Sequence, residues 1–205
     1  MDERIKKTMK ALRDNNIGGY YAEDKNKLLE LISEFIKVGS IIGSGDSVTL
    51  EQTGVFEYLR KADYVFLDKH KKGLSSEEKR EIYLKNFSAD TFITGTNAIT
   101  MNGELFNIDG NGSRVAPMIY GPKQVIVVVG KNKITKDVKE AIYRTRQIAA
   151  PLDAKRLHKN TPCVKLGYCI DCKNLDRICN DFVLISRQFI KNRIKVIIVD
   201  EVLGY

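Results

Sequence analysis

Residues 124–129 read Gln124-Val125-Ile126-Val127-Val128-Val129, in which five branched apolar side chains follow one another without a polar interruption. A strand with no polar face is typical of a parallel sheet that is covered by helices on both sides. The run is strand-sized, well short of the roughly 18 apolar residues that a membrane-spanning helix needs. We therefore expect a buried central strand in an α/β fold and no membrane span.

The rest of the chain alternates between helical and extended patterns. Apolar residues at helical spacing predict helices over residues 2–14, 25–37, from 49 onward, 75–86 and 135–149. Short apolar runs predict strands over residues 20–22, 40–42, 64–67, 91–94, 182–186 and 194–199. Such alternation predicts βαβ units and a mainly parallel sheet flanked by helices, as one domain over residues 1–205.

Local signals predict several boundaries of these elements. Ser75 with Glu78 forms a capping-box pattern, and Thr49 with Gln52 has the same spacing. Thr135 is expected to cap a helix that Pro151 ends. The pair Asn102-Gly103 lies between two short apolar runs and predicts a small antiparallel hairpin.

The charge of the chain limits its partners. The formal net charge is +8, but basic residues alternate with acidic ones, and no run of five or six like charges occurs. Nucleic acid is therefore not an expected partner, and an anionic small molecule fits the charge better. Residues 1–7 have no apolar stretch behind their charges, so no secretory signal is expected and the location predicted is cytoplasmic.

The segment Gly43-Ser44-Gly45-Asp46-Ser47-Val48-Thr49 leaves a predicted strand and enters a predicted helix. Glycines let backbone N–H groups face a ligand closely, and the hydroxyls of Ser44, Ser47 and Thr49 add donors. The segment lacks the Gly-Lys-Ser/Thr ending of a P-loop and the GxGxxG spacing. Two interpretations stay open, a carboxylate or phosphate site that includes Gly43 and Gly45, and an ordinary tight turn.

A second segment, from Gly95 to Arg114, holds four glycines, four asparagines, two acids and one arginine. Turn chemistry accounts for part of this composition, because Asn-Gly and Asp-Gly supply positive-φ positions. It does not account for Asn97 and Asn107, which stand beside apolar strand residues. The candidate ligand-binding residues here are Gly95, Asn97, Asn107, Asp109, Gly110, Asn111, Gly112 and Arg114.

Both segments resemble the signature of the LUD (lactate utilization) domain family, in its single-domain form. The resemblance rests on residues 43–51, 94–114, 121–133, 149–151 and 203–205 and covers nearly the whole chain. It implies a NagB/RpiA/CoA transferase-like fold, the fold of ribose-5-phosphate isomerase, glucosamine-6-phosphate deaminase and the CoA transferases. It also implies a role beside iron–sulfur subunits that oxidise lactate to pyruvate.

A more distant likeness bears on catalysis. The segment from Gly95 also resembles a stretch of methylthioribose-1-phosphate isomerase. In this resemblance, Asn97 stands at the position of the catalytic Asp of that enzyme. An amide cannot take up a proton as a carboxylate does, so isomerase chemistry through Asn97 is disfavoured. Glu104 is the carboxylate that we consider as a catalytic candidate. An exposed hairpin residue is an equally good interpretation of Glu104.

All four cysteines lie close together, at Cys163, Cys169, Cys172 and Cys179. Disulfides are disfavoured in a reducing cytosol, so zinc or an iron–sulfur cluster is the leading interpretation, with reduced thiols or a redox pair as the alternative. Only one CxxC spacing is present, and the outer spacings match neither a zinc ribbon nor a ferredoxin.

Three functional hypotheses follow. The first is a LUD-type protein of lactate or related 2-hydroxy-acid metabolism that binds an anionic molecule between residues 43–49 and 95–114. The second is a non-catalytic assembly or electron-transfer partner, with zinc or iron–sulfur at the cysteines, beside lactate-oxidising subunits. The third is a sugar-phosphate isomerase or CoA transferase-like enzyme. The sequence leaves a homo-oligomer open.

Overall fold

The computed structural model describes all residues from Met1 to Tyr205. Its largest element is a six-stranded sheet in the order β1-β10-β7-β4-β2-β3, and every neighbouring pair in it is parallel. These strands are β1 (Gly18–Ala22), β2 (Ile41–Ser44), β3 (Val65–Phe66), β4 (Thr91–Gly95), β7 (Gln124–Gly130) and β10 (Ile194–Val199). The predicted α/β fold with a mainly parallel sheet is confirmed.

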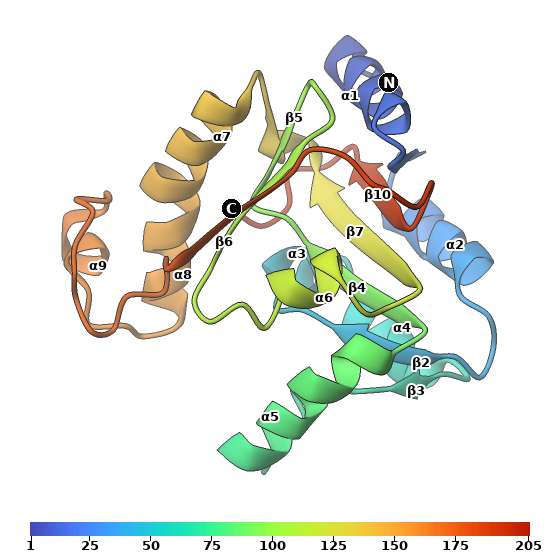
Figure 1. Cartoon of the computed structure of the whole chain (residues 1–205), viewed down its shortest axis with the longest axis horizontal. Coiled ribbons are helices and arrows are strands. Elements are labelled where there is room, and N and C mark those ends of the chain that lie inside the picture. Colours follow the sequence, from blue (N-terminus) through green and yellow to red (C-terminus); the bar gives the residue numbers. More distant parts are fainter.

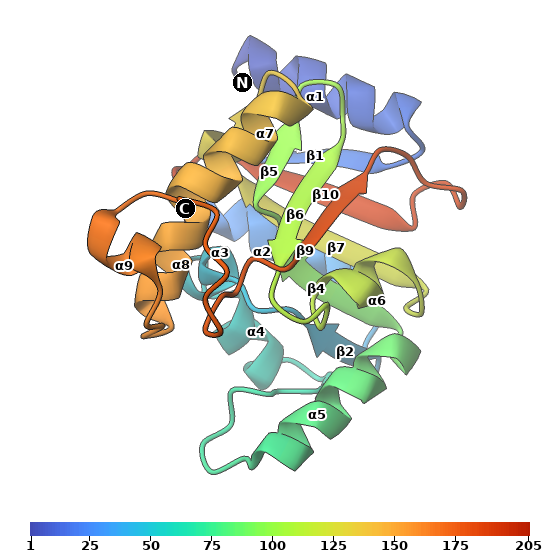
Figure 2. The ribbon, with the colours of Figure 1, turned by 60° about the vertical axis from the view of Figure 1, so that its left-hand side comes forward.

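A second, smaller sheet has the order β8-β5-β6-β9 and lies against the first (Figure 2). Its strands are β5 (Ala98–Thr100), β6 (Leu105–Asp109), β8 (Ile134–Thr135) and β9 (Asp181–Ile185). Strands β5 and β6 form the predicted antiparallel hairpin, and Gly103 at its turn has the positive φ of 77° that the Asn-Gly pair supplies.

Strand β7 explains why the sheet is covered on both sides. Val125, Val127 and Val129 point into one apolar cluster, with α1 and the second sheet, while Ile126 and Val128 point into another, with the helices α2 to α4. Successive side chains of a strand face opposite sides, so an uninterrupted apolar run requires a core on each face.

The helices surround this sheet, as Figure 1 shows. They are α1 (Glu3–Asp14), α2 (Lys25–Phe35), α3 (Val48–Gln52), α4 (Val55–Lys61), α5 (Ser76–Lys85), α6 (Val115–Ile119), α7 (Val138–Arg144), α8 (Ala150–Arg156) and α9 (Pro162–Leu166). The capping box of Ser75 and Glu78 is present at the start of α5. None of these helices is long and apolar enough to cross a membrane.

Three predicted helix boundaries are wrong. Asp137, not Thr135, caps α7, because its side chain accepts from the N–H of Glu140. Ser47, not Thr49, caps α3, because its side chain accepts from the N–H of Leu50. Pro151 does not end the helix that starts after its cap Asp137, since a π turn over residues 145–149 joins α7 to α8. Proline has no N–H to donate to the preceding turn, and the wider π turn directly before it accommodates that loss.

The core on the α1 side of the sheet makes a testable contribution to stability. Phe92 on β4 is fully buried there, whereas Phe189 is fully exposed. We expect Phe92→Ala to lower the free energy of unfolding by about 3–5 kcal/mol, because it removes buried apolar surface and leaves a cavity. Phe189→Ala is the matched control, with an expected change within about 0.5 kcal/mol in urea unfolding. Equal effects of the two substitutions would contradict this assignment of the core.

Candidate functional site

A cavity of about 390 Å³ lies beyond the carboxyl ends of the large sheet's strands. Chain segments that follow β2, β4, β7 and β10 all reach it, through Asp46, Gly95, Lys133 and Tyr205. The strand order reverses between β2 and β4, since β2 continues outward to β3 whereas β4 has β7 on its other side. In open α/β sheets, this is where ligands bind, and the volume is within the range of small-molecule sites.

Other walls of the cavity come from outside the large sheet. The end of β6 and the loop after it contribute Ile108 to Asn111 and Ser113. The helix from α7 to α8 contributes Thr145, Ala149, Asp153 and Arg156. Residues 177–179, from the cysteine-containing segment, complete the lining. The cavity therefore lies where the large sheet, the small sheet and the α7–α8 helix meet.

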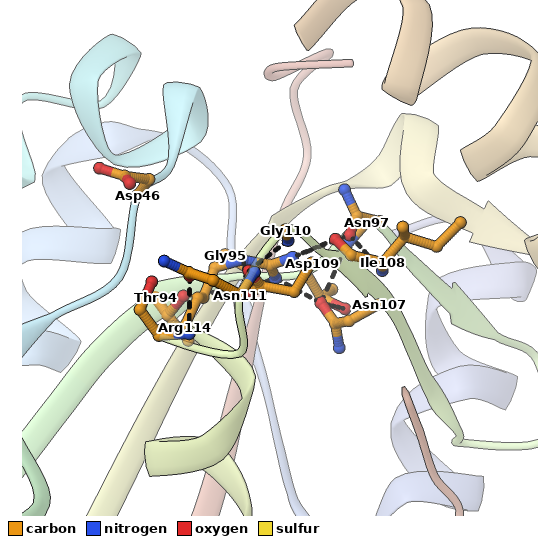
Figure 3. A network of polar contacts seen from close by, with 12 residues as sticks. Asp46, Thr94, Gly95, Asn97, Asn107, Ile108, Asp109, Gly110, Asn111 and Arg114 are labelled. Carbon is orange, nitrogen blue, oxygen red and sulfur yellow. Dashed lines mark hydrogen bonds and ion pairs between the residues drawn. The ribbon is translucent and has the colours of Figure 1, made fainter. Parts of the chain in front are cut away.

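The side chain of Arg114 forms the centre of a polar network at this junction (Figure 3). Its Nη1 donates to Asn107 Oδ1 at 2.6 Å and to the carbonyl of Gly95 at 3.5 Å. Its Nη2 donates to Asn97 Oδ1 at 3.0 Å and to the carbonyl of Ile108 at 2.8 Å. Four acceptors on β4, on the hairpin and on the turn between them thus hold the guanidinium.

The two asparagines of this network also bind backbone. Asn97 Oδ1 accepts from the N–H of Ile108 at 3.0 Å, and Asn107 Oδ1 accepts from the N–H of Asn97 at 3.3 Å. The hydroxyl of Thr96 donates to Asn107 Oδ1 at 3.2 Å. Asn107 is completely buried, so its amide oxygen serves the fold. Asn97 lines the cavity, and its Nδ2 donates to no protein group.

Two glycines allow the segments that bear these residues to approach one another. A Cβ on Gly45 would stand 2.5 Å from Thr94 Oγ1 and 2.8 Å from Arg114 Cγ. A Cβ on Gly95 would stand 2.5 Å from Ser47 Oγ. Real Cβ atoms do not come this close to other atoms, so both positions require glycine. The loops after β2 and β4 therefore touch beside Arg114.

The loop after β2 also carries a carboxylate. Asp46 lies 3.0 Å from the Nζ of Lys69 and 3.6 Å from the Nε2 of His70. Burial alone would raise the pKa of Asp46, but the neighbouring Lys69 ammonium outweighs it and holds this pKa below its ordinary value. Asp46 is thus an ionised, paired carboxylate at the cavity wall.

Lys133 is a buried cation at the cavity with no carboxylate in ion-pair contact. Its side chain comes from the turn after β7 and is only 5% exposed. Its Nζ donates to Thr49 Oγ1 at 3.0 Å and to the carbonyl of Thr96 at 3.4 Å. Burial, together with the positive charges of Arg144 and Arg114, lowers the pKa of Lys133 to about 7.

The other two carboxylates of the cavity have polar partners. Asp153 accepts from Arg156 at 2.9 Å and from the hydroxyl of Tyr205 at 3.2 Å. Asp109 accepts the N–H of Gly110 through Oδ1 at 2.7 Å. Its Oδ2 is buried, lies 3.6 Å from Arg114 Nε and accepts no hydrogen bond. One acceptor at the cavity is therefore left for a donor that the protein does not supply.

Comparison with known proteins adds to this geometry. The model of the LUD domain matches residues 5–199, nearly the whole chain. The chain belongs to the LUD domain family. No curated protein matches its sequence.

Three solved structures are similar to this LUD domain, and one of them shares its fold over nearly the whole chain. A DUF162 family protein from Deinococcus radiodurans is similar over 96% of both chains, at 14% identity and a TM-score of 0.51. Ribose-5-phosphate isomerase A from Methanocaldococcus jannaschii covers 65% of this chain and 62% of its own, at 16% identity and a TM-score of 0.36. The delta subunit of eIF2B from Chaetomium thermophilum covers 58% of this chain and 51% of its own, at 16% identity and a TM-score of 0.38.

The ligand-binding residues expected from the sequence fall into two groups, those that line the cavity and those that do not. Those that line the cavity are Ser47, Gly95, Asn97, Asp109, Gly110, Asn111 and Arg114. Those that do not line it are Gly43, Ser44, Gly45, Thr49, Asn107 and Gly112. Within the second group, Thr49 still contacts Lys133, and Gly43 is in the strand β2, packed against Asn86.

Glu104, the carboxylate considered for catalysis, does not line the cavity. It sits at the turn of the β5–β6 hairpin, where its Oε2 accepts from the hydroxyl of Thr100 at 2.8 Å. The turn packs on α1, because Asn15 Nδ2 donates to the carbonyl of Asn102 at 2.9 Å. The cavity lies at the opposite end of the hairpin.

Sequence reasoning missed several residues of the cavity. Lys133 and Tyr205 appear in the sequence only as parts of the family pattern, and no sequence signal points to Asp153 or Arg156 as cavity residues. A signal for Lys133 exists, because it lies in the turn after the most buried strand, at a carboxyl end. Arg144 is also buried and donates to the carbonyl of Asn97 at 2.7 Å.

The four cysteines form a cluster of free thiols beside α8. As the side chains lie, no three histidine, cysteine, aspartate or glutamate residues are arranged to hold a metal ion. Cys179 also lines the large cavity, so the cluster and the cavity share a wall.

The Arg114 network predicts a specific stability effect. Arg114→Lys keeps the charge but replaces a planar fork by one nitrogen, which cannot reach acceptors on Asn97, Asn107 and Ile108 together. We expect the free energy of unfolding in urea to fall by about 2–4 kcal/mol, because buried acceptors lose their donors. Arg187→Lys, at an exposed position, is the control. An Arg114→Lys protein as stable as the control would show that the fork does not join the two sheets.

Proposed function

We propose that this LUD domain binds a small metabolite that bears a carboxylate, of the 2-hydroxy-acid class, in the cavity between the two sheets. The observation that carries the proposal is Lys133, a buried amine at the cavity with no acidic partner. A buried charge is costly unless it is paired, so a site of this kind favours an anion.

The electrostatics around Lys133 support an anionic ligand. Arg144 is also buried, and it donates only to the carbonyls of Asn97 and Asn132. Asp46 is paired with Lys69, and Asp153 is bonded to Arg156, so these carboxylates are already engaged. A ligand carboxylate would supply the negative charge that the protein leaves out next to Lys133, with the charge of Arg144 behind the cavity wall adding to the positive potential. An ammonium has three donors, of which two are used by Thr49 and Thr96.

A hydroxyl on the same ligand would satisfy a second group. The Oδ2 of Asp109 is a buried acceptor without a donor, and Asn97 Nδ2 is a donor without an acceptor. A 2-hydroxy acid carries an anionic carboxylate beside a group that both donates and accepts. The name of the family, lactate utilization, fits this class of molecule. A three-carbon acid leaves part of the 390 Å³ to water, so larger members of the class also fit.

The geometry gives less support to the alternative of an isomerase or CoA transferase. Asn97 offers an amide where the isomerase-like pattern has an acid, and Arg114 and the N–H of Ile108 hold its oxygen in place. Glu104 lies at the far turn of the hairpin. We therefore propose ligand binding and assign no reaction to the cavity.

The ligand proposal is tested by removing the amine. Lys133→Met keeps the length of the side chain and its apolar stem but cannot pair with a carboxylate. In a thermal-shift screen of lactate, pyruvate and larger 2-hydroxy and 2-oxo acids, we expect at least one acid to raise the Tm of the parent protein. We expect Lys133→Met to lose that rise, corresponding to an affinity at least about tenfold lower.

Two controls make this screen specific. Lys139→Met removes an exposed lysine of the same region and is expected to leave the thermal shift unchanged. The amide of the same acid, which has no charge, is expected to give no shift with the parent protein. A shift that Lys133→Met retains in full, or that the uncharged amide also produces, would place the ligand elsewhere.

The affinity is expected to depend on pH. In the protein without ligand, the amine of Lys133 has a pKa of about 7. A bound anion raises this pKa, because a nearby negative charge favours the protonated amine. Below pH 7, Lys133 is already protonated, and the affinity should be constant. Above pH 7, binding must take up a proton, so the dissociation constant should rise by up to about tenfold per pH unit. Calorimetry in buffers of different ionisation enthalpy measures this uptake, and its absence at pH 8 would contradict the role of Lys133.

A further inference from the structure

We propose that the four cysteines bind one Zn²⁺ ion through their thiolates, at a site beside α8. One small cavity beside α8 is lined by all four cysteines, Cys163, Cys169, Cys172 and Cys179. They come from different parts of the C-terminal segment, yet their side chains face the same space. Once side-chain rotation brings them onto one ion, four thiolates would form the tetrahedral set that zinc prefers.

The segment that carries the cysteines lacks the means to fold by burial. From Pro162 to Asn180 no side chain is fully buried, and its only regular element is the five-residue helix α9 (Figure 2). Its apolar residues are largely in solvent, including Leu175, which is fully exposed. A loop of this length without a core of its own needs another source of order. A metal that joins distant ligands supplies such order, as in small metal-stabilised domains.

The Cys169–Cys172 turn has the local features of a metal-binding knuckle. The backbone N–H of Asp171 donates to Cys169 Sγ at 3.4 Å, and Asp171 has a positive φ of 53°. Gln147 on the π turn fixes Cys169 from both sides, because its side chain accepts from the N–H of Cys169 at 3.1 Å and donates to its carbonyl at 3.4 Å. Hydrogen bonds to sulfur stabilise a thiolate, which is the form that binds metal.

Two arginines provide charge that a zinc tetrathiolate needs. Such a centre carries two negative charges, since four thiolates surround one divalent ion. The Nη2 of Arg146 lies 3.7 Å from Cys169 Sγ. Arg177 donates to the carbonyls of Cys172 and Cys179, and these two hydrogen bonds link both cysteines to the same guanidinium. Both arginines also pair with Asp171, at 2.9 Å and 3.3 Å.

The space between the cysteines is small. As the thiols lie, its volume is about 20 Å³, roughly one water-sized particle, so a single ion requires less rearrangement of the segment than a cluster of several iron and sulfide atoms. The thiols surround this space without yet forming a set of three ligands. Side-chain rotation within a segment that has no fully buried residue brings them together, and metal binding completes the site.

The proposed centre would also shape the large cavity. Arg177, Ile178 and Cys179 line both cavities, so the chain that would hold the metal forms one wall of the proposed ligand site. The zinc site stands on its own residues and does not depend on the ligand proposed for the large cavity.

The experiment measures metal and thiols in the full chain, purified without chelator under reducing conditions. We expect one zinc per chain by mass spectrometry of the metals, and four thiols that react with a thiol reagent only after the zinc is removed. Exchange with Co²⁺ should give the intense absorption of a tetrahedral all-sulfur site. Removal of zinc should open the segment to trypsin at Lys165 and Lys173, while the sheet stays folded.

Variants separate the cysteines from other ligands. We expect Cys172→Ser to reduce zinc retention at least tenfold, and His158→Ala, the matched control on the nearest histidine, to retain one zinc per chain. If Cys172→Ser does not fold, the zinc content and the cobalt spectrum of the parent protein still decide the question. Folded parent protein that is metal-free with four reactive thiols would overturn the proposal. So would a disulfide between two of the cysteines, or iron with acid-labile sulfide in place of zinc.

Discussion

The buried guanidinium of Arg114 is the interaction on which the rest of the structure depends. It connects the end of β4, in the large sheet, to the base of the β5–β6 hairpin, in the small one. A charge is tolerated there because four oxygen acceptors surround it and the carboxylate of Asp109 lies 3.6 Å away, so the two sheets can meet in this arrangement and in few others. The close approach of Gly45 to this side chain then fixes the loop after β2. The cavity is the space that these constraints leave open.

The electrostatic character of this space follows from which charges are paired within the protein. Arg114 is held by the fold, Asp46 by Lys69 and Asp153 by Arg156. Lys133 and Arg144 are the cations that burial isolates from any carboxylate in ion-pair contact. For the ligand that we propose, charge would count before shape, because a neutral molecule of the same size leaves the desolvated amine without compensation.

The sequence predicts the fold well where the signal is local or concerns burial. The apolar run of β7, the Asn-Gly hairpin and the Ser75–Glu78 cap each follow from a few neighbouring residues. The sequence fails where distant segments decide the outcome. Arg114 and Asn107 have the residue types of a ligand site, yet partners that the topology brings together engage them within the fold. Conversely, the sequence places Lys133 after a buried strand but does not show that its side chain is buried, since its surroundings come from α3, the turn after β4 and α7.

The π turn between α7 and α8 sets the rotational phase of the helix that follows it. A regular α-helix turns by about 100° per residue, and a π turn contains one residue more than an α turn. Asp153 and Arg156 therefore face the cavity, while Pro151 faces the cysteines. Losing one residue from 145–149 would leave a longer, more regular helix and turn both surfaces away from their partners. The irregular turn thus acts as a spacer of one residue, and in related chains insertions and deletions should be rarer there than in the exposed loops.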